Sequence, residues 1–326
     1  MVKVSGGIGR SWMARRDVPT FLSYGVLLVL MLVNVIVDPY FFTSFSLGTF
    51  FTDALPLVLI SIGQFAVILT SGIDLSVGST VSIANTFVAL HMTSSPATMV
   101  AVSLEVIFLG AMAGLINGLI IHYGRIQPIL ATLATMSVYE GIALFILPTP
   151  GGTIPASFTT ALTGTVGGLP VAIWILILLV LAWWWAHRTR LVLHLLALGS
   201  DETAARMNGV RVGIVKIGAY VLSGLFAGLA GLYLAAQTTS GDPNVGAPLL
   251  LLSIAAVVIG GVRLAGGRGN LLGVIAGALV LSILGGIMYF AGVSSYYQDL
   301  FQGLILLFAV ALSSYRKLRN RYMQTR

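Results

Sequence analysis

Residues 54–92 read ALPLVLISIGQFAVILTSGIDLSVGSTVSIANTFVALHM. Two apolar runs, 54–70 and 75–92, are separated here by a short polar break at Ser71–Asp74. Each run approaches the roughly 20 residues that a helix needs to cross a bilayer. The break therefore predicts two helices that cross in opposite directions, and it sets the orientation of every later segment.

The composition extends this interpretation to the whole chain. Its 326 residues are 57% hydrophobic and 8% charged, with a mean hydropathy of +1.00, whereas soluble domains carry about 25% charged residues. So few charges cannot cover the surface of a soluble protein of this size, so we predict an all-α polytopic membrane protein. The long apolar runs argue against a β-barrel, whose strands alternate. The absence of cysteine excludes disulfides and thiolate chemistry.

Ten segments have the length and apolar character of transmembrane helices. A single transmembrane domain, 1–326, would contain them, with a tail at 1–19, an inside loop at 187–212 and a tail at 316–326. The predicted spans are 20–37, 54–70, 75–92, 97–121, 126–147, 169–186, 213–236, 248–262, 271–291 and 298–315.

The basic residues predict the orientation of these spans. With ten spans, all 17 Lys and Arg residues lie on the side of the N-terminus, and such residues accumulate in cytoplasmic loops. If 54–70 and 75–92 were one span, the basic residues would be divided between the two sides. We therefore predict ten spans with both termini in the cytoplasm. The segment 1–19 lacks the pattern of a cleaved signal peptide and is interpreted as a retained tail.

The longest outside loop, Pro148–Gly168, reads PTPGGTIPASFTTALTGTVGG and is uncharged. Such a loop could cap an entrance or meet a partner, or it could simply connect two spans.

A short repeat relates the two halves of the chain. LGAMAG at Leu109–Gly114 recurs as LGVIAG at Leu272–Gly277. Five predicted spans separate the copies, which would make two inverted five-helix halves, a pattern found in transporters. The alternative is that both copies are small-residue packing motifs, which are common in membrane helices.

Charged residues inside the spans are few. Asp74, Glu105 and Glu140 are the clear cases, with Asp299 near the outer end of the last span. Ion-coupled carriers and pumps use such groups in chains or pairs, so their scarcity favours an uncharged substrate. For Glu105 and Glu140, hydrogen bonding between helices is favoured over acid–base catalysis.

Asp74 lies in SGIDLSVGS, Ser71–Ser79, and has two interpretations. It could belong to a broken helix that lines a pathway, together with the hydroxyls of Ser76 and Ser79. It could instead cap the following helix by accepting its free N–H groups.

Neutral amide side chains are more frequent in the spans than charges. Asn34, Gln64, Asn85, Asn117 and Gln127 could bind hydroxyl groups without the cost of burying a charge, or could join helices. The four histidines are not spaced as metal ligands, and no metal site is predicted. No GxxxxGK[ST] phosphate-binding loop occurs, so this chain is not expected to bind ATP by that motif.

The inside loop between the sixth and seventh spans is the most informative stretch. Residues 187–216 read HRTRLVLHLLALGSDETAARMNGVRVGIVK. Asp201 is expected to cap a short helix over Glu202–Met207, and Gly209 to end it. A short polar helix here suits docking to a cytoplasmic partner, although a plain connector would look similar.

Six stretches in order resemble the permease subunits of bacterial sugar ABC importers of the ribose and galactofuranose type. Each alone is a weak signal, but their order in a ten-span chain is specific. They are SGIDLSVGS at Ser71–Ser79, NGLIIHYGRIQPILATLATM at Asn117–Met136, ALGSDETAARMNGV at Ala197–Val210, AYVLSGLFAGLAG at Ala219–Gly231, IAAVVIGG at Ile254–Gly261 and AGGRGNLLGVIAGAL at Ala265–Leu279.

This resemblance implies a transport subunit in the bacterial inner membrane that is not itself an enzyme. It would form the path for a monosaccharide or similar neutral polyol as a homodimer or heterodimer with a second permease subunit. A cytoplasmic ABC ATPase, whose two nucleotide-binding domains are often fused into one chain in this family, would bind ATP and Mg, so no cofactor is expected in this chain. A periplasmic sugar-binding protein would deliver the cargo, and no nucleic acid is involved.

The resemblance and the residue types together define two candidate sets. The substrate-pathway set is Gln64, Asp74, Ser76, Ser79, Asn85, Asn117 and Gln127. The ATPase-coupling set is Gly199, Asp201, Glu202, Ala204, Ala205, Arg206 and Gly209.

Two departures from the family pattern bear on this expectation. The family has acidic residues before IAAVVIGG, but this chain has LLLS at Leu250–Ser253. The usual Asn of the coupling segment is Asp201, which can still cap a helix. The first departure leaves open which sugar is carried and how the two subunits of a heterodimer would divide the work.

Two other classes of protein compete with a sugar ABC importer. An ion-coupled carrier would transport its substrate without an ATPase, and a membrane enzyme would turn over its substrate alone.

Overall fold

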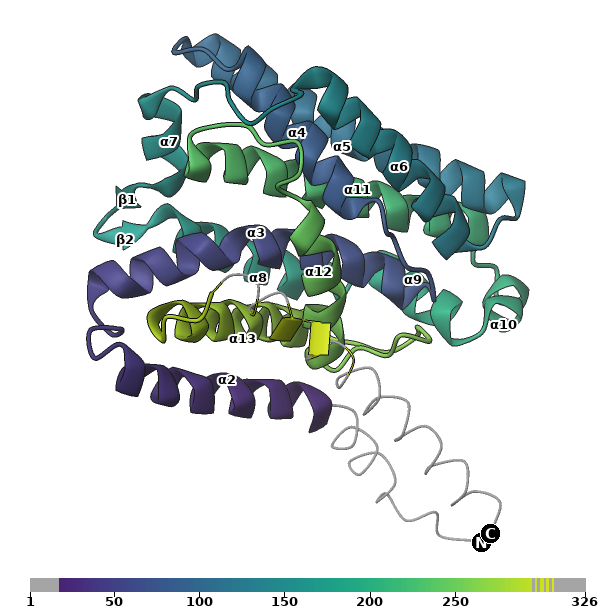
Figure 1. Cartoon of the computed structure of the whole chain (residues 1–326). Coiled ribbons are helices and arrows are strands. Elements are labelled where there is room, and N and C mark those ends of the chain that lie inside the picture. Colours follow the sequence, from purple (N-terminus) through teal and green to yellow (C-terminus); the bar gives the residue numbers. More distant parts are fainter. Residues whose placement is uncertain (1–17, 295–296, 298–299, 302, 305–306, 308–326) are drawn as a thin grey trace, which may run out of the picture.

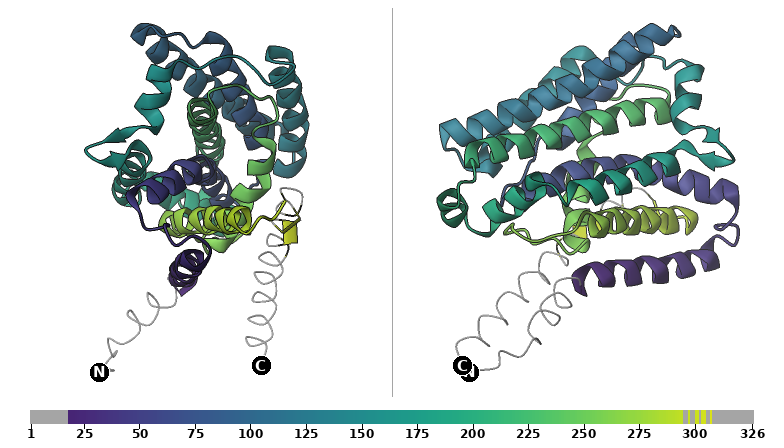
Figure 2. Two further views of the ribbon diagram at one scale, coloured as in Figure 1. Left: turned by 60° about the vertical axis from the view of Figure 1, so that its left-hand side comes forward. Right: turned by 180° about the vertical axis from the view of Figure 1, so that it is seen from behind.

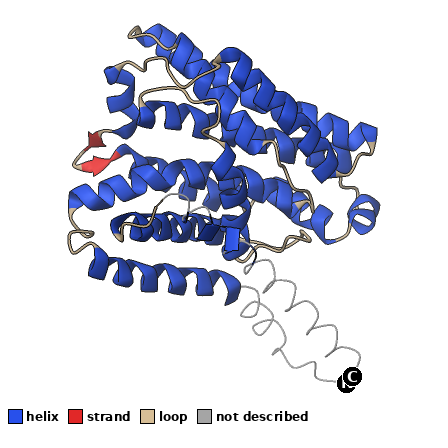
Figure 3. Ribbon diagram, in the orientation of Figure 1, coloured by secondary structure: helices blue, strands red, loops and turns tan. Residues whose placement is uncertain are grey.

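The computed structural model describes residues 18–294, 297, 300–301, 303–304 and 307 (Figure 1). Within this part the chain is mostly helical, and its one small sheet pairs β1 (Thr165–Val166) with β2 (Leu169–Pro170) in antiparallel register (Figure 3). The helices are α2 (Val18–Val37), α3 (Ser44–Leu69), α4 (Val77–His91), α5 (Pro96–Gly124), α6 (Pro128–Ile146), α7 (Ala156–Thr163), α8 (Val171–Ala186), α9 (Arg190–Ser200), α10 (Glu202–Met207), α11 (Val212–Thr238), α12 (Ala247–Ile259) and α13 (Leu271–Phe290).

The lengths of these helices confirm an all-α membrane protein. In the described part, α3, α5, α6, α11 and α13 are each long and apolar enough to cross a bilayer, and α8 with α9, bent by 75°, would add a sixth span. The helices α2 and α12 are apolar over shorter stretches. The span predicted at 298–315, with Asp299, and both predicted tails lie largely or wholly outside the described residues. The count of ten spans stays a prediction.

Helix α3 forms the centre of the molecule. It packs against α11, α13, α12 and α8, and it is buried from Ala54 to Leu69. It begins at Ser44 rather than at residue 54, since the Thr43 hydroxyl caps it by accepting a hydrogen bond from the Ser46 N–H at 3.3 Å. The charge of Asp53 falls inside this helix, where its carboxylate accepts a 2.6 Å hydrogen bond from Gln237.

The predicted break after α3 is confirmed, because α3 ends at Leu69 and α4 begins only at Val77. The two helices are therefore separate elements, as the polar stretch SGIDLS indicated. Helix α4 then packs against α5, α6, α11 and α12, which places its polar residues in the interior.

Both copies of the short repeat make close helix contacts. A Cβ atom at Gly110 or Gly114 would overlap backbone atoms of α11, and one at Gly277 would overlap the Ala256 carbonyl of α12. Such contacts require glycine, because any side chain would push the helices apart. The packing interpretation is therefore confirmed for both copies, and the relation of the two halves by inversion stays a prediction.

The loop at 148–168 is folded. It contains α7 and the β1–β2 hairpin, and Gly151 pairs with Gly241 beyond the end of α11 through N–H···O bonds of 2.9 and 2.7 Å. This loop occupies one end of the bundle, and α10 lies at the opposite end (Figures 1 and 2). Its role stays a prediction.

The loop at 187–212, which the sequence predicts to lie inside, contains a helix that the sequence analysis did not anticipate. Helix α9 buries Val192, Leu195 and Leu198 against α3 and α11. These residues recur every three positions, which is the spacing of one helix face. The sequence of α9 therefore contained a helix signal of its own, next to the one that predicted α10.

Candidate functional site

The segment between α3 and α4 turns sharply at Ser71. Its φ angle is +65°, in the left-handed region, and the Gly72 N–H donates to the Val67 carbonyl at 3.2 Å. A Cβ atom at Gly72 would lie 2.5 Å from the Tyr220 hydroxyl oxygen, so a larger residue here would have to displace the Tyr220 side chain of α11. This turn directs the next residues of the chain into the interior.

Asp74 is 1% exposed and accepts three hydrogen bonds. Its Oδ1 accepts from the Ser76 N–H at 3.0 Å and from the Ser76 hydroxyl at 2.7 Å. Its Oδ2 accepts from the Ser223 hydroxyl of α11 at 2.9 Å. The capping interpretation was wrong in detail, because Ser76 is the N-cap of α4 and the carboxylate bonds Ser76 instead of the free N–H groups inside the helix.

The hydrogen bonds continue from Ser76 across two further helices. Asn117 of α5 donates to the Ser76 hydroxyl at 2.7 Å, and Thr135 of α6 donates to the Asn117 amide oxygen at 2.7 Å. Asp74, Ser76, Ser223, Asn117 and Thr135, here called the Asp74 network, thus connect the α3–α4 segment with α5, α6 and α11. A second contact from α6 lies beside it, since the Thr132 hydroxyl donates to the Ile73 carbonyl at 3.3 Å.

The Asp74 network joins helices and has little capacity left for a ligand. Both carboxylate oxygens of Asp74 and both ends of the Asn117 side chain already have partners. A buried polar group with its partners in place contributes stability, and a ligand could bind it only by replacing one of them.

Ser79 and Asn85, both on α4, also bond within the protein. The Ser79 hydroxyl donates to the Ser76 carbonyl at 3.0 Å. The Asn85 amide oxygen accepts from the Asp242 N–H at 2.7 Å, which fixes the connection between α11 and α12. The Asn85 amide nitrogen has no partner among the described residues.

Gln64 differs from the other predicted pathway residues. Its side chain is 0% exposed in the middle of α3, and neither amide atom has a partner among the described residues. The hydroxyl of Ser61, one helical turn earlier, is buried and unpaired in the same way. Each buried polar group without a partner lowers the stability of the fold by roughly 1–3 kcal/mol. Gln64 and Ser61 are therefore free to hydrogen-bond a ligand, whereas the Asp74 network has almost no free donor or acceptor.

Three polar residues of α5 and α6 lie on the outside of the single chain. Gln127 is exposed at the N-cap of α6 and makes no capping bond. Glu105 and Glu140 are also exposed, and no hydrogen bond within the described part of the chain joins either one to a neighbouring helix. The expectation that they bond helices within this chain was wrong, because both point away from the buried faces of α5 and α6.

The short helix predicted over Glu202–Met207 is confirmed at its predicted bounds, and its role in coupling to an ATPase stays a prediction. Asp201 caps α10 by accepting from the Thr203 and Ala204 N–H groups at 2.9 and 3.0 Å. Gly209, with φ +81°, ends the helix. Its N–H donates to the Arg206 carbonyl at 3.0 Å, and the Val210 N–H donates to the Ala205 carbonyl. Glu202 holds α10 to α11 through a 2.8 Å ion pair with Lys216 and lies 3.5 Å from Arg206.

The coupling set divides into an exposed and a buried part. Asp201, Glu202, Ala204, Arg206 and Gly209 are exposed, whereas Ala205 faces the protein. Gly199 lies in a contact between backbones, since a Cβ atom there would overlap the Leu69 carbonyl of α3. Met207, which the predicted coupling set leaves out, is 83% exposed at the end of α10.

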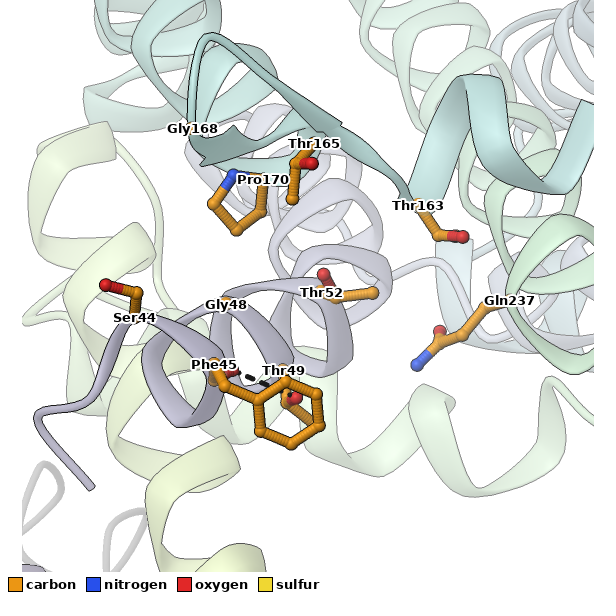
Figure 4. A pocket seen from close by; sticks show the side chains of 10 residues that line it. All are labelled: Ser44, Phe45, Gly48, Thr49, Thr52, Thr163, Thr165, Gly168, Pro170 and Gln237. Atoms are coloured by element: carbon orange, nitrogen blue, oxygen red, sulfur yellow. Dashed lines mark hydrogen bonds between the residues drawn. The ribbon is translucent and has the colours of Figure 1, made fainter. Parts of the chain in front are cut away.

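A cavity of about 430 Å³ opens at the end of the bundle that carries α7 and the hairpin (Figure 4). Its walls come from the first turns of α3, from the hairpin and from the end of α11, and they carry several hydroxyl groups. None of the predicted pathway residues lines it. The lining residues are Ser44, Phe45, Gly48, Thr49, Thr52, Thr163, Thr165, Gly168, Pro170 and Gln237.

Comparison with known families decides the class of this protein. Residues 46–310 match the family described as branched-chain amino acid transport system / permease component. The chain belongs to this family. It is therefore a permease component of a transport system and not a catalytic subunit.

Similar permeases have been named for sugar import. The chain is 37% identical to the ribose import permease protein RbsC of Escherichia coli (strain K12) over 296 residues, which cover 88% of this chain and 91% of that protein. It is 33% identical to the galactose/methyl galactoside import permease protein MglC of the same strain over 318 residues, 91% and 95% of the two chains. RbsC of Bacillus subtilis is 36% identical over 290 residues, 88% and 90%. No solved structure matches the chain.

Several residues of this permease matter to the site but were not predicted. Ser223, Thr132 and Thr135 complete or adjoin the Asp74 network, and each lies in a stretch that the resemblance already singled out. The available signal was a small polar residue inside a predicted span. The sequence could not show that they meet Asp74, because the contacts join helices that are far apart in the chain.

Proposed function

We propose that this permease is the transmembrane subunit of an ATP-driven, binding-protein-dependent importer of a monosaccharide. It works in the inner membrane with a cytoplasmic ABC ATPase, which carries the ATP and Mg, and with a periplasmic sugar-binding protein. Support comes from the names of its relatives, which refer to ribose and galactose/methyl galactoside import. The structural observation that carries the proposal is α10, a capped and exposed helix at one end of the bundle.

The proposed topology is ten spans with both termini in the cytoplasm, in one domain made of two inverted halves. In this topology α10 and the C-terminal end of α5 lie on the same, inner side. The packing supports this assignment, because the His122 ring at the end of α5 lies against Gly213 at the start of α11, directly after α10. All 17 basic residues then fall inside, in accordance with the charge bias of cytoplasmic loops.

The exposed carboxylates of α5 and α6 favour a second permease subunit. Glu105 and Glu140 lie within helices long enough to span the bilayer. A charged side chain in contact with lipid costs about 2.5–3.5 kcal/mol on insertion scales. We infer that this face meets a second permease subunit or the aqueous path between the two subunits. Gly141, which has open space around its Cα, allows close approach there.

The cargo is proposed to be an uncharged polyol. An amino acid would bring a carboxylate and an ammonium group, which require charged or dipolar partners in the path. Asp74 is fully occupied by Ser76 and Ser223, so it offers an ammonium group no free oxygen. The unpaired Ser61 and Gln64 supply hydroxyl and amide groups, which suit sugar hydroxyls. The hydroxyl-lined cavity at the opposite end from α10 would face the delivered sugar.

The proposed mechanism transmits closure of the ATPase to the path. Nucleotide-driven closure moves α10, the two halves rock, and the access of the central path changes sides. Residues of α10 and the end of α9 would dock the ATPase, and residues of α3 and α4 would line or support the path.

The test is reconstitution of this permease in liposomes with the ATPase and binding protein encoded beside it. Uptake of ribose, galactose and leucine is measured with and without internal ATP. ATP-dependent uptake of a sugar but not of leucine is expected. Leucine uptake would identify an amino-acid importer, uptake driven by an ion gradient without ATPase would identify a carrier, and either result would overturn the proposal.

A further inference from the structure

Three segments of the permease meet at Ser71. The Ser71 hydroxyl lies 2.8 Å from the Ala265 carbonyl and 3.2 Å from the Gly199 carbonyl, and it donates to both. Gly199 belongs to the last turn of α9, and Ala265 to the loop between α12 and α13. One side chain thus connects the turn after α3 with two segments that lie 128 and 194 residues away.

The backbones around Ser71 are in direct contact. The Gly267 N–H donates to the Leu69 carbonyl at 3.0 Å, and the Ser200 hydroxyl donates to the Gly267 carbonyl at 3.3 Å. At Gly267, where φ is +72°, a Cβ atom would lie 2.7 Å from the Ser200 Cα. Where two backbones touch with no side chain between them, the segments have little room to slide past each other. The three segments should therefore move together. We call Ser71, Gly199, Ser200, Ala265 and Gly267 the Ser71 junction.

The Ser71 junction lies between α10 and the Asp74 network. Ser200 directly precedes Asp201, the N-cap of α10, and Ser71 is three positions before Asp74. Gly72 and Ile73, between them, contact Tyr220 and Thr132, so the intervening chain is held on both sides. A displacement of α10 would therefore reach Asp74 through a short and closely packed path.

Ser71 keeps a conformation that is unfavourable for its residue type. A residue other than glycine at φ +65° is strained, and such residues persist where the surroundings impose the geometry. At the equivalent turn after α12, Gly261 with φ +83° meets the same need without strain. Glycine at position 71 would relieve the strain but would lack the hydroxyl that bonds Gly199 and Ala265.

We propose that Ser71 is a positioning residue that couples movement of the ATPase-docking helix α10 to the Asp74 segment of the transport path. The proposal rests on the proposed function, because it assumes that α10 docks an ATPase. The Ser71 hydroxyl holds the end of α9 and the α12–α13 loop to the turn after α3. Without it, the backbone contact between Gly267 and Leu69 remains, but the segment at Asp74 follows a movement of α10 less closely.

The experiment measures sugar transported per ATP hydrolysed in liposomes that contain the complete importer. Two variants remove the hydroxyl, Ser71→Ala and Ser71→Gly, and the second also removes the backbone strain. The matched control is Thr70→Val, because the Thr70 hydroxyl bonds only the Val67 carbonyl within α3. Thermal unfolding and ATPase co-purification are measured on every variant.

Both Ser71 variants should assemble with the ATPase and keep stimulated ATP hydrolysis, while sugar transported per ATP falls about fivefold, the effect of about one hydrogen bond. Thr70→Val should match the wild type. An unchanged ratio in Ser71→Ala and Ser71→Gly, a loss in Ser71→Ala alone, or equal losses of hydrolysis and uptake would overturn the proposal. If the wild-type complex shows no ATP-dependent sugar uptake, the proposed function has failed, and this inference fails with it.

Discussion

The Asp74 carboxylate accepts a 2.9 Å hydrogen bond from the Ser223 hydroxyl, 149 residues further along the chain. This contact fixes the segment between α3 and α4 against α11, and the other carboxylate oxygen binds Ser76. A buried charged group held in this way serves first to keep helices in place. A ligand could bind Asp74 only if these bonds were exchanged as the helices move.

Replacing Asp74 should therefore destabilise the fold. Asp74→Ala should lower the free energy of unfolding by about 4–5 kcal/mol, because it removes three hydrogen bonds to a charged group, each of which contributes at least about 1.5 kcal/mol. Ser223→Ala removes one of these three bonds and should have a smaller effect, about 1.5 kcal/mol. Thermal unfolding of the detergent-solubilised permease measures both. Ser103→Ala is the control, since its hydroxyl bonds only the Met99 carbonyl one turn away; equal stability of the Asp74 and Ser103 variants would contradict this prediction.

Gln64 should behave in the opposite way. Because both of its amide atoms are buried without partners, Gln64→Leu should leave the permease as stable or up to about 2 kcal/mol more stable. Sugar uptake should nevertheless fall, as the amide is proposed to bind the cargo. Asn117→Leu is the contrasting variant, and it should unfold more easily because it breaks the bonds to Ser76 and Thr135. Normal uptake by Gln64→Leu would exclude Gln64 from the path.

Met207 should contribute to ATPase binding without contributing to the fold. Its side chain is 83% exposed, so Met207→Asp should leave thermal unfolding unchanged. Burial of one such side chain contributes about 1.5–3 kcal/mol, so affinity for the ATPase should fall by about tenfold or more. Met207→Leu keeps an apolar side chain and should retain binding. Affinity is measured by titrating the purified ATPase; an unchanged value for Met207→Asp would remove Met207 from the docking surface.

The exposed face of α6 should lie at the contact between two permease subunits. The chain has no cysteine, so single substitutions report contacts cleanly. Gly141→Cys should form disulfide-linked dimers under mild oxidation of membranes, seen on non-reducing gels. Ile36→Cys, on an exposed position of α2 with 81% exposure, should stay monomeric. Crosslinking at Ile36 and not at Gly141 would move the contact to α2.

Helix α10 shows how much local sequence decides. Asp201 caps α10 and Gly209 ends it, as predicted, because both effects depend on atoms within a few residues of each other. The break at Ser71 was equally readable, since Gly72 and Asp74 within four residues favour a turn over a continued apolar helix. By contrast, α9 was missed because its apolar periodicity was short and adjoined a span.

The candidate path could be predicted only in part. Gln64, Asp74 and Asn117 were identified as polar residues inside spans, a pattern visible in one dimension. Asp74 and Asn117 have hydrogen-bond partners on other helices, whereas Gln64 has none among the described residues. This difference depends on which helices are neighbours, which the sequence alone did not show. Likewise, Glu105 and Glu140 could not be assigned to the outer face until the packing of α5 and α6 was known.

The sequence by itself determined that this protein is a helical membrane protein, that the chain breaks between residues 70 and 75, and where α10 begins and ends. Those properties follow from hydropathy and from hydrogen bonds between near neighbours, which the order of residues specifies directly. Only the tertiary structure decided that Ser71 holds three distant segments together and that Ser223 donates the third hydrogen bond to Asp74. The physical reason is that hydrogen bonds between helices depend on helix packing, which the local sequence does not encode.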